Sequence, residues 1–183
     1  MKPQNAIALF IAGIGIGIIL TALFISTDNY STTNPALDSN SIQISFCPKD
    51  PCSENLISQL DAAQQTIDIA IYSFTLDEIS DALIAAHERG VTVRVVFDKS
   101  QAASQYSEDE RLAQAGIPLK IMQKNRGIMH NKFAVIDNQT VATGSYNYSQ
   151  NATENNNENL IILHSPQIAE QYETEFEFLW NEN

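Results

Sequence analysis

The chain has 183 residues, a length that corresponds to a single domain of ordinary size. Its formal net charge of −12 comes from 10 Lys and Arg against 22 Asp and Glu. So acidic a surface disfavours the binding of nucleic acid over the whole protein. The hydrophobic fraction of 44% and the charged fraction of 17% exclude a disordered acidic tail and a collagen-like repeat. All ten basic residues lie between Lys2 and Lys132, whereas residues 139–183 contain seven Glu and no Lys or Arg. An anionic substrate must therefore be bound locally.

An uncharged run from Ala6 to Ser26 lies near the N-terminus. As a helix it is long enough to cross a hydrocarbon core of roughly 30 Å. Phe24 and Ile25 stand where a cleavage site needs small residues, which favours an uncleaved anchor over a cleaved signal peptide. Because Lys2 precedes the run and the polar flank after it lacks Lys and Arg, the positive-inside bias predicts a single-pass membrane protein with its folded domain outside the cytoplasm.

The stretch after this run predicts a tether, since it is rich in Ser, Thr, Asn and Asp and has no apolar period. Cys47 and Cys52 are the only cysteines, and outside the cytoplasm they would most simply form a disulfide. Free thiols are the alternative, and a metal site is disfavoured because no further His or Cys lies nearby. The expected organisation is residues 1–5 as a cytoplasmic N-terminus, 6–26 as a transmembrane signal anchor, 27–40 as a polar linker and 41–183 as the folded domain.

Strand patterns recur after the linker. Ile42, Ile44 and Phe46 alternate with polar or small residues, as a half-buried strand does. Residues 66–74, a helix and residues 92–99 form a βαβ unit, so these two strands should be parallel neighbours. Four more short strands are predicted over residues 118–124, 130–137, 139–147 and 158–165.

Helix signals lie between these strands, and one helix is predicted over residues 53–65. The glutamates of the last helix are expected to form a solvated face. The whole pattern predicts an α/β fold with one mixed sheet of about six to seven strands flanked by helices. Three further helix starts are indicated by the capping boxes of Thr75 with Glu78 and of Ser107 with Glu110, and by Ser165 with Pro166.

The chemistry is concentrated in one stretch, HNKFAVID followed six residues later by GSYN. Alternate residues of a strand share a face, so His130 and Lys132 should project to the same side. A turn and an antiparallel return strand would bring Gly144, Ser145 and Asn147 alongside them. An imidazole, an ammonium, a hydroxyl and an amide that converge on one point suit a phosphate.

These residues form the pattern HxK(x)4D(x)6GSxN, which is the signature of the phospholipase D superfamily. The GSYNYS run and the later NNNENLIIL make the chain similar to the small, single-motif branch, which includes a bacterial secreted endonuclease and the mitochondrial cardiolipin hydrolase. The likeness runs from about Ile42 to the C-terminus. It implies a phospholipase D-like fold and a phosphodiesterase activity.

The resemblance implies roles for the residues at the matched positions. His130 would attack phosphorus and form a covalent phosphohistidine. Lys132 and Asn147 would hold the non-bridging oxygens, and the Ser145 hydroxyl would assist them. Glu158 matches the downstream acid that accepts a hydrogen bond from the second imidazole nitrogen and orients the ring.

Other residues are expected around this centre. Asp137 belongs to the signature, but it falls at a predicted Asp-Asn turn, so we expect it to order the turn rather than to take part directly in the chemistry. Gly144 would let a ligand approach the backbone. Tyr72 would line the substrate cleft, and Lys124 and Arg126 would contribute positive charge to it.

Members of the family need two histidines, one as nucleophile and one as general acid. This chain has one HxK motif, so the resemblance implies a homodimer with the two motifs facing each other. No metal or other cofactor is expected, because the paired lysines and asparagines would supply the charge stabilisation.

Two kinds of phosphodiester remain open as substrate. An endonuclease acting on DNA or RNA is favoured by the local motif and by a basic run of Lys120, Lys124, Arg126 and Lys132. A phospholipase D acting on phosphatidylcholine or cardiolipin is favoured by the anchor, which would hold the domain near lipid head groups, and by the net charge. A non-catalytic phosphate-binding protein is a remote alternative, because no site residue is missing. We lean towards the endonuclease.

Overall fold

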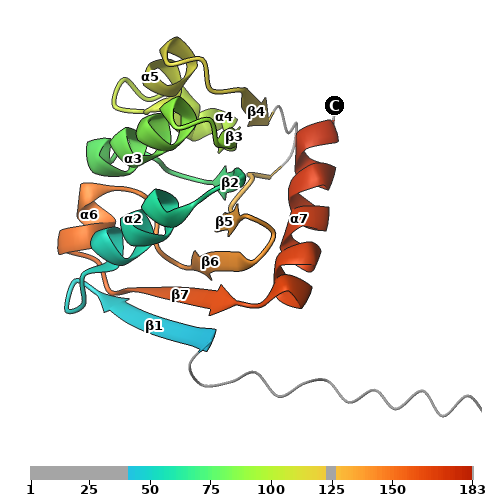
Figure 1. Cartoon of the computed structure of the whole chain (residues 1–183). Coiled ribbons are helices and arrows are strands. Elements are labelled where there is room, and N and C mark those ends of the chain that lie inside the picture. Colours follow the sequence, from blue (N-terminus) through green and yellow to red (C-terminus); the bar gives the residue numbers. More distant parts are fainter. Residues whose placement is uncertain (1–40, 123–126, 183) are drawn as a thin grey trace, which may run out of the picture. The chain divides into compact units, whose positions relative to one another are not determined.

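The computed structural model describes residues 41–122 and 127–182. The predicted anchor and linker, Lys124 and Arg126 lie outside the described residues. Within the two described ranges, none of the helices is long and apolar enough to span a membrane. Seven strands form one mixed sheet in the order β1-β7-β6-β5-β2-β3-β4, which confirms the predicted sheet (Figure 1). The strands are β1 Ile42–Cys47, β2 Thr66–Ile71, β3 Thr92–Asp98, β4 Leu119–Met122, β5 Lys132–Ile136, β6 Thr140–Gly144 and β7 Glu158–His164.

Chain direction divides the sheet into two parts. β2, β3 and β4 run parallel, as predicted for the βαβ unit, whereas β5, β6, β7 and β1 pair antiparallel with their neighbours. Ile71 at the end of β2 lies opposite Lys132 at the start of β5, and Cys47 at the end of β1 lies opposite Glu158 at the start of β7. The ends of β1, β2, β3 and β6 and the starts of β5 and β7 therefore meet at one edge of the sheet.

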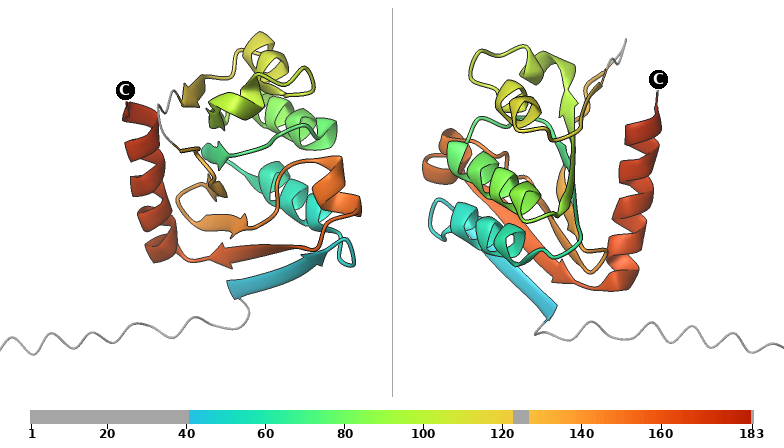
Figure 2. Two further views of the ribbon diagram at one scale, coloured as in Figure 1. Left: turned by 180° about the vertical axis from the view of Figure 1, so that it is seen from behind. Right: turned by 45° about the horizontal axis from the view of Figure 1, so that its top comes forward.

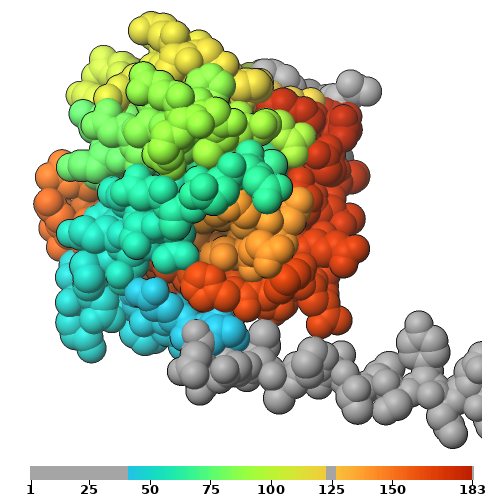
Figure 3. All heavy atoms as spheres, in the orientation of Figure 1, coloured from blue at the N-terminus to red at the C-terminus, as the bar shows by residue number. Residues whose placement is uncertain are grey.

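Helices cover both faces of this sheet (Figure 2). α2 and α3 lie on one face and α7 lies on the other (Figure 2). In the space-filling view α2 and α3 lie at the front and α7 lies at the right (Figure 3). The short helices α4 and α6 are absent from the sequence-based prediction, because neither is long enough to show a helical apolar period. The helices are α2 Cys52–Ala62, α3 Asp77–Glu88, α4 Lys99–Ala102, α5 Asp109–Gln114, α6 Gln150–Glu154 and α7 Pro166–Asn181.

Alternation along the central strand β2 supplies the larger core. Ile67, Ile69 and Ile71 share one side of the strand and are fully buried against α2 and α3. Leu56 of α2 and Leu83 of α3 are also fully buried in this cluster. The apolar side of β2 therefore packs against the apolar sides of α2 and α3 in one layer. This layer holds the ends of the strands in place.

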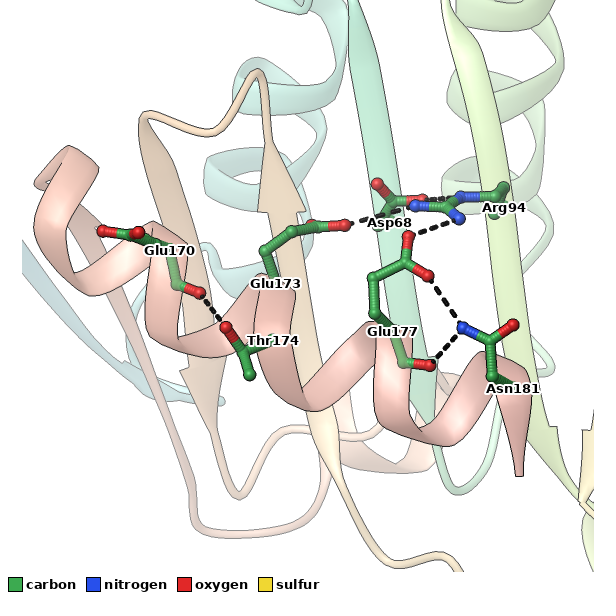
Figure 4. A network of polar contacts seen from close by, with 7 residues as sticks. All are labelled: Asp68, Arg94, Glu170, Glu173, Thr174, Glu177 and Asn181. Atoms are coloured by element: carbon green, nitrogen blue, oxygen red, sulfur yellow. Dashed lines mark hydrogen bonds and ion pairs between the residues drawn. The ribbon is translucent and has the colours of Figure 1, made fainter.

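The face covered by α7 has a polar network at its centre (Figure 4). Arg94 of β3 donates to Asp68 of β2 at 2.6 Å, and to Glu173 and Glu177 of α7 at 3.2 and 2.8 Å. Its guanidinium also lies 4.7 Å from the centre of the Phe176 ring. Burial, reinforced by the neighbouring carboxylates, raises the pKa of Glu173 to about 7, and burial also raises the pKa of Asp68. The prediction of a solvated face is therefore wrong for Glu173 and Glu177, whose ion pairs with Arg94 join α7 to the sheet.

β1 turns its large apolar side chains outward, although a half-buried strand would be expected to bury them. Ile44 and Phe46 are each 56% exposed, whereas Ser45 is 2% exposed. The Ser45 hydroxyl accepts a hydrogen bond of 2.9 Å from an asparagine of α2, and a disulfide joins Cys47 to Cys52 at the start of that helix. These two links hold the small, polar side of the strand against α2 and leave the other side exposed.

The predicted helix starts agree with the structure in one case of three. Ser165 caps α7 as expected, since its hydroxyl accepts a backbone N–H three residues later. α3 and α5 each begin one residue later than the boxes of Thr75 with Glu78 and of Ser107 with Glu110 require, and neither helix has a side-chain cap. The two capping-box predictions are therefore wrong, although both helices exist.

Candidate active site

The signature residues gather where strands end. His130 precedes β5, Ser145 and Asn147 follow β6, and Glu158 begins β7, at the edge where these strand ends meet. Tyr72 follows β2 at the same edge. Because His130, Ser145 and Asn147 lie outside the strands, the expected alternation along a strand does not position them. Hydrogen bonds from the connecting segments do so instead.

The Lys132 side chain contacts both the backbone of the histidine and an aromatic ring. Its Nζ donates a hydrogen bond of 2.9 Å to the His130 carbonyl oxygen. The Tyr72 ring lies 4.5 Å from the imidazole, centre to centre, and 4.9 Å from Lys132 Nζ. Lys132 is 9% exposed, and burial lowers its pKa, against the opposing charge of Glu158. His130 is exposed, so a ligand can reach its imidazole from solvent.

Two hydrogen bonds fix the backbone on either side of His130. The Tyr72 N–H donates to the Asn131 carbonyl oxygen at 2.9 Å. The Met129 N–H donates to the Asp98 carboxylate at 2.8 Å, and Asp98 is only 3% exposed at the end of β3. Sequence reasoning missed Asp98, because an acidic residue at the end of an apolar strand gives no sign of which backbone group it binds.

Glu158 is hydrogen-bonded to Ser145 rather than to the histidine. The Ser145 hydroxyl donates to Glu158 Oε2 at 2.5 Å and accepts from the Asn159 N–H at 3.0 Å. Asn156 donates a further hydrogen bond of 3.2 Å to the same carboxylate. In the part of the chain that the structure describes, the expected bond between Glu158 and the His130 imidazole is not formed. The carboxylate orients the serine directly and acts on the rest of the site through its charge.

A glycine is needed at position 144 because the backbone of the neighbouring strand β7 lies very close to it. Its φ is 145°, and a Cβ at this position would lie 2.2 Å from the Asn159 carbonyl oxygen. That oxygen accepts hydrogen bonds from the N–H groups of Ser145 and Tyr146, at 3.1 and 3.3 Å. The small residue was expected to admit a ligand, but here it admits the backbone of β7, which in turn positions the serine.

Asn147 is oriented by the segment that follows β2. Its Oδ1 accepts a hydrogen bond of 3.3 Å from the Ser73 N–H. Because the amide oxygen is used in this way, its two N–H donors remain for a ligand within the described part of the site. This orientation suits an anion, since a phosphate oxygen accepts hydrogen bonds and donates none.

Asp137 lies at the opposite end of β5 from the histidine. Its carboxylate accepts hydrogen bonds from the N–H groups of Gln64, Gln65 and Thr66, at 2.9, 2.7 and 2.9 Å. Asp137 and Asn138 have φ values of 53° and 52°, which form the predicted tight turn between β5 and β6. The signature aspartate therefore joins this turn to the segment that enters β2.

The predicted basic run is only partly located by the structure. Lys120 lies on the edge strand β4, and its Nζ donates to the carbonyl oxygens of Trp180, at 3.2 Å, and Glu182 at the end of α7. Including Lys120 among the substrate-binding charges is therefore wrong, because its ammonium caps a helix. Lys124 and Arg126 lie outside the described residues.

The two other histidines lie on different elements. His87 belongs to α3, and His164 ends β7, where its Nδ1 is 3.0 Å from the Thr140 hydroxyl. Among residues 41–122 and 127–182 there is no group of three His, Cys, Asp or Glu side chains placed to hold a metal ion.

The site as a whole combines the exposed His130 imidazole and the buried Lys132 ammonium with amide and hydroxyl donors from Asn147 and Ser145. This combination is typical of a phosphoryl-transfer site.

Comparison with known proteins gives the family. Residues 56–180 match the family model described as the phospholipase D-like domain of cardiolipin synthase. The match covers more than half of the chain and includes every residue of the signature. The chain belongs to the phospholipase D superfamily.

Individual relatives are similar over most of this chain. The mitochondrial cardiolipin hydrolase of Chlamydomonas reinhardtii is 36% identical over 125 residues, which are 68% of this chain and 56% of that protein. The phospholipase D of Rickettsia prowazekii (strain Madrid E) is 31% identical over 190 residues, 94% of this chain and 92% of the relative. The crystal structure of Nuc, a phospholipase D family member from Salmonella typhimurium, has a TM-score of 0.72 at 35% identity and covers 77% of this chain and 94% of Nuc. The match thus spans little more than half of the algal relative.

Proposed function

We propose that this chain is a metal-independent phosphodiesterase that works through a phosphohistidine intermediate. The observation that carries the proposal is the exposed His130 imidazole and the buried Lys132 ammonium, which belong to residues two apart in the chain and both lie against the Tyr72 ring. A bond from the imidazole nitrogen to phosphorus would form as the bond to the leaving oxygen breaks, and that oxygen would take a proton from a general acid. Water would then release the phosphate monoester and free the histidine. Lys132 and the N–H donors of Asn147 would stabilise the charge on the non-bridging oxygens.

We infer a homodimer from the need for a second proton carrier. The leaving oxygen needs a general acid, and the chain has three histidines, of which two lie on α3 and at the end of β7. His130 of a second copy would supply the acid if the two motifs face each other across a twofold axis.

The dimer has its own test. Wild-type and His130→Ala chains are unfolded, mixed in equal amounts and refolded together. A site that needs both histidines would keep about a quarter of the wild-type activity, because only wild-type pairs are complete, whereas independent sites would keep about half.

Nucleic acid is the first candidate substrate. The site is open, and a cleft of about 300 Å³ lined by Asp98, Lys99, Met122 and Ile128, among others, lies next to it, since Asp98 binds the residue before His130. Its apolar side chains, Met122 and Ile128, with the single cation Lys99 beside them, fit a nucleotide that flanks the scissile phosphate.

A phospholipid is the second candidate, because the relatives include proteins named mitochondrial cardiolipin hydrolase and phospholipase D. Ile44 and Phe46 are exposed on β1, close in sequence to residues 6–26, which we propose as a membrane anchor.

We also propose that the folded domain lies outside the cytoplasm. The disulfide between Cys47 and Cys52 supports this location. Protease added to intact cells would then digest the domain.

One panel tests the activity and separates the substrates. The purified chain is incubated with single-stranded DNA, duplex DNA, RNA, phosphatidylcholine vesicles and cardiolipin vesicles, with and without EDTA. We expect one class to be cleaved equally well in EDTA and not by the His130→Ala variant. Loss of cleavage in EDTA, or full activity of His130→Ala, would contradict the proposal.

A further inference from the structure

Asp98 is a buried carboxylate that the phosphodiesterase signature does not include. It ends β3 and is 3% exposed. Its Oδ1 accepts hydrogen bonds from the Ser100 N–H, at 2.9 Å, and from the Ser100 hydroxyl, at 2.5 Å. Its Oδ2 accepts the Met129 N–H at 2.8 Å. The two oxygens of one carboxylate therefore join the start of α4 to the segment that leads into β5.

The ionised form of this carboxylate is the one that the surroundings stabilise. Burial alone would raise its pKa, but the Ser100 hydroxyl and the N–H groups of Met129, Ser100 and Gln101 together lower it. Within the described residues, Asp98 has no ion-pair partner. Hydrogen-bond donors, most of them from the backbone, thus hold the charge, which makes the contact directional.

The Met129 contact holds the peptide unit between Ile128 and Met129, one residue before the histidine. Met129 is 2% exposed and packs in the apolar cluster beneath α7. The following carbonyl groups are held as well, that of His130 by Lys132 Nζ and that of Asn131 by the Tyr72 N–H. Three successive residues are therefore fixed, and Asp98 supplies the contact on the N-terminal side.

Asp98 reaches the imidazole by a second route. It caps α4, whose Gln101 donates a hydrogen bond of 3.2 Å to the Tyr72 hydroxyl. The Tyr72 ring in turn lies against the His130 imidazole, 4.5 Å away between ring centres. Asp98 therefore positions the backbone before His130 directly, through Met129. It positions the Tyr72 ring indirectly, through α4 and Gln101.

We propose that Asp98 is a positioning residue that sets the attack geometry of the His130 imidazole. The proposal rests on the proposed phosphodiesterase activity and adds to it a residue outside the signature. Only a carboxylate can accept on both sides, because an Asn side chain turned to accept from Ser100 would present its NH₂ group to the Met129 N–H. A displacement of about 1 Å at a reacting group can cost on the order of a hundredfold in rate.

The test uses the full chain and the substrate that the wild type cleaves. In Asp98→Asn we expect kcat to fall about 10- to 100-fold with KM changed less than about twofold, because the ligand contacts remain and the attack angle is lost. Amide hydrogen exchange at Met129 should accelerate in Asp98→Asn, whereas Ser100→Ala, which removes a donor to the other oxygen, should leave it slow. Asp68→Asn is the matched control, since Asp68 is also 3% exposed but binds Arg94 under α7. It should lower the melting temperature and keep the kcat of the folded protein.

The results of these experiments distinguish the positioning role of Asp98 from the proposed phosphodiesterase activity. A folded Asp98→Asn variant with kcat within twofold of wild type, or with Met129 exchange as slow as wild type, would overturn the positioning role. The same holds if Asp68→Asn loses kcat to the same extent, because the effect would then be general destabilisation. If the wild type cleaves no phosphodiester, the proposed function fails, and the exchange measurement still decides whether Asp98 orders the loop.

Discussion

The Lys132 ammonium donates a hydrogen bond of 2.9 Å to the carbonyl oxygen of His130, two residues earlier in the chain. The same side chain is 9% exposed, and burial lowers its pKa, whereas the nearby negative charge of Glu158 acts to raise it. One cation thus binds the backbone of the residue that we propose as nucleophile, and it is also the cation that we propose to bind phosphate oxygens.

Lys132→Met should therefore lower kcat/KM strongly with little loss of fold. The Met side chain keeps the apolar stem, but it removes the charge that we propose for the non-bridging oxygens, which costs about 10²- to 10³-fold. Steady-state kinetics on the cleaved substrate, with circular dichroism as a check on folding, measures this. Arg89→Met is the control, because Arg89 is an exposed cation that follows α3 at the opposite end of the sheet from the site. Equal losses in the two variants would contradict the local role.

Gly144→Ala should destabilise the domain by about 3 kcal/mol or more, because the new Cβ would meet the Asn159 carbonyl oxygen and the φ of 145° is strained for any other residue. Gly90 offers a matched control, since its φ is also positive but a Cβ there has nothing within 4 Å. Gly90→Ala should cost only about 1 kcal/mol. Urea unfolding of both variants decides it, and similar costs would show that strain and not the Asn159 contact governs Gly144.

Asp137→Asn should lower stability and leave chemistry intact. Its carboxylate accepts three backbone N–H groups, and an amide would turn its own donors towards some of them, which costs about 1 to 3 kcal/mol. The exposed Asp61→Asn change should stay within about 0.5 kcal/mol of wild type. Thermal unfolding and kcat of the folded fraction are the measurements. A loss of kcat without a loss of stability would instead give this aspartate a direct chemical role.

Glu173 should make stability depend on pH in a weakly acidic window. Its pKa is raised from 4.5 to about 7 in the folded chain, first by burial, so the folded state binds the proton more tightly than the unfolded chain does. This contribution to stability is fully present below pH 4.5 and is lost as pH rises through about 7. Glu173→Gln removes the titration. The melting temperature of wild type should therefore fall relative to that of the variant between pH 4.5 and 7, and parallel curves would contradict this.

Much of the fold could be predicted from sequence because short-range periodicity determines it. The alternation of Ile67, Ile69 and Ile71 marks a buried strand by itself, and the signature spacing brings His130 and Asn147 to one sheet edge once the strands pair. The orientation of β1 could not be predicted in the same way. Ile44 faces solvent because a hydrogen bond and a disulfide to α2 hold the opposite side of the strand, and both depend on residues of another element.

The polar contacts were the least predictable part of the site. Glu158 was expected at the His130 imidazole and instead is bonded to Ser145, and Lys120 was expected at the substrate and instead caps α7. A charged side chain several bonds long can reach alternative partners within a few ångströms of one another. Which partner it takes is decided by tertiary packing, as for Asp98, and sequence spacing does not encode it.

The covalent intermediate on His130 is the central claim, and trapping it is the most direct test. A substrate labelled with ³²P at the scissile phosphate is mixed with the full chain, the reaction is quenched in alkali, which preserves phosphohistidine, and the labelled peptide is identified by mass spectrometry. We predict label on His130 in the wild type and none in His130→Ala. Turnover without a labelled histidine at any quench time, or label on another residue, would contradict the account.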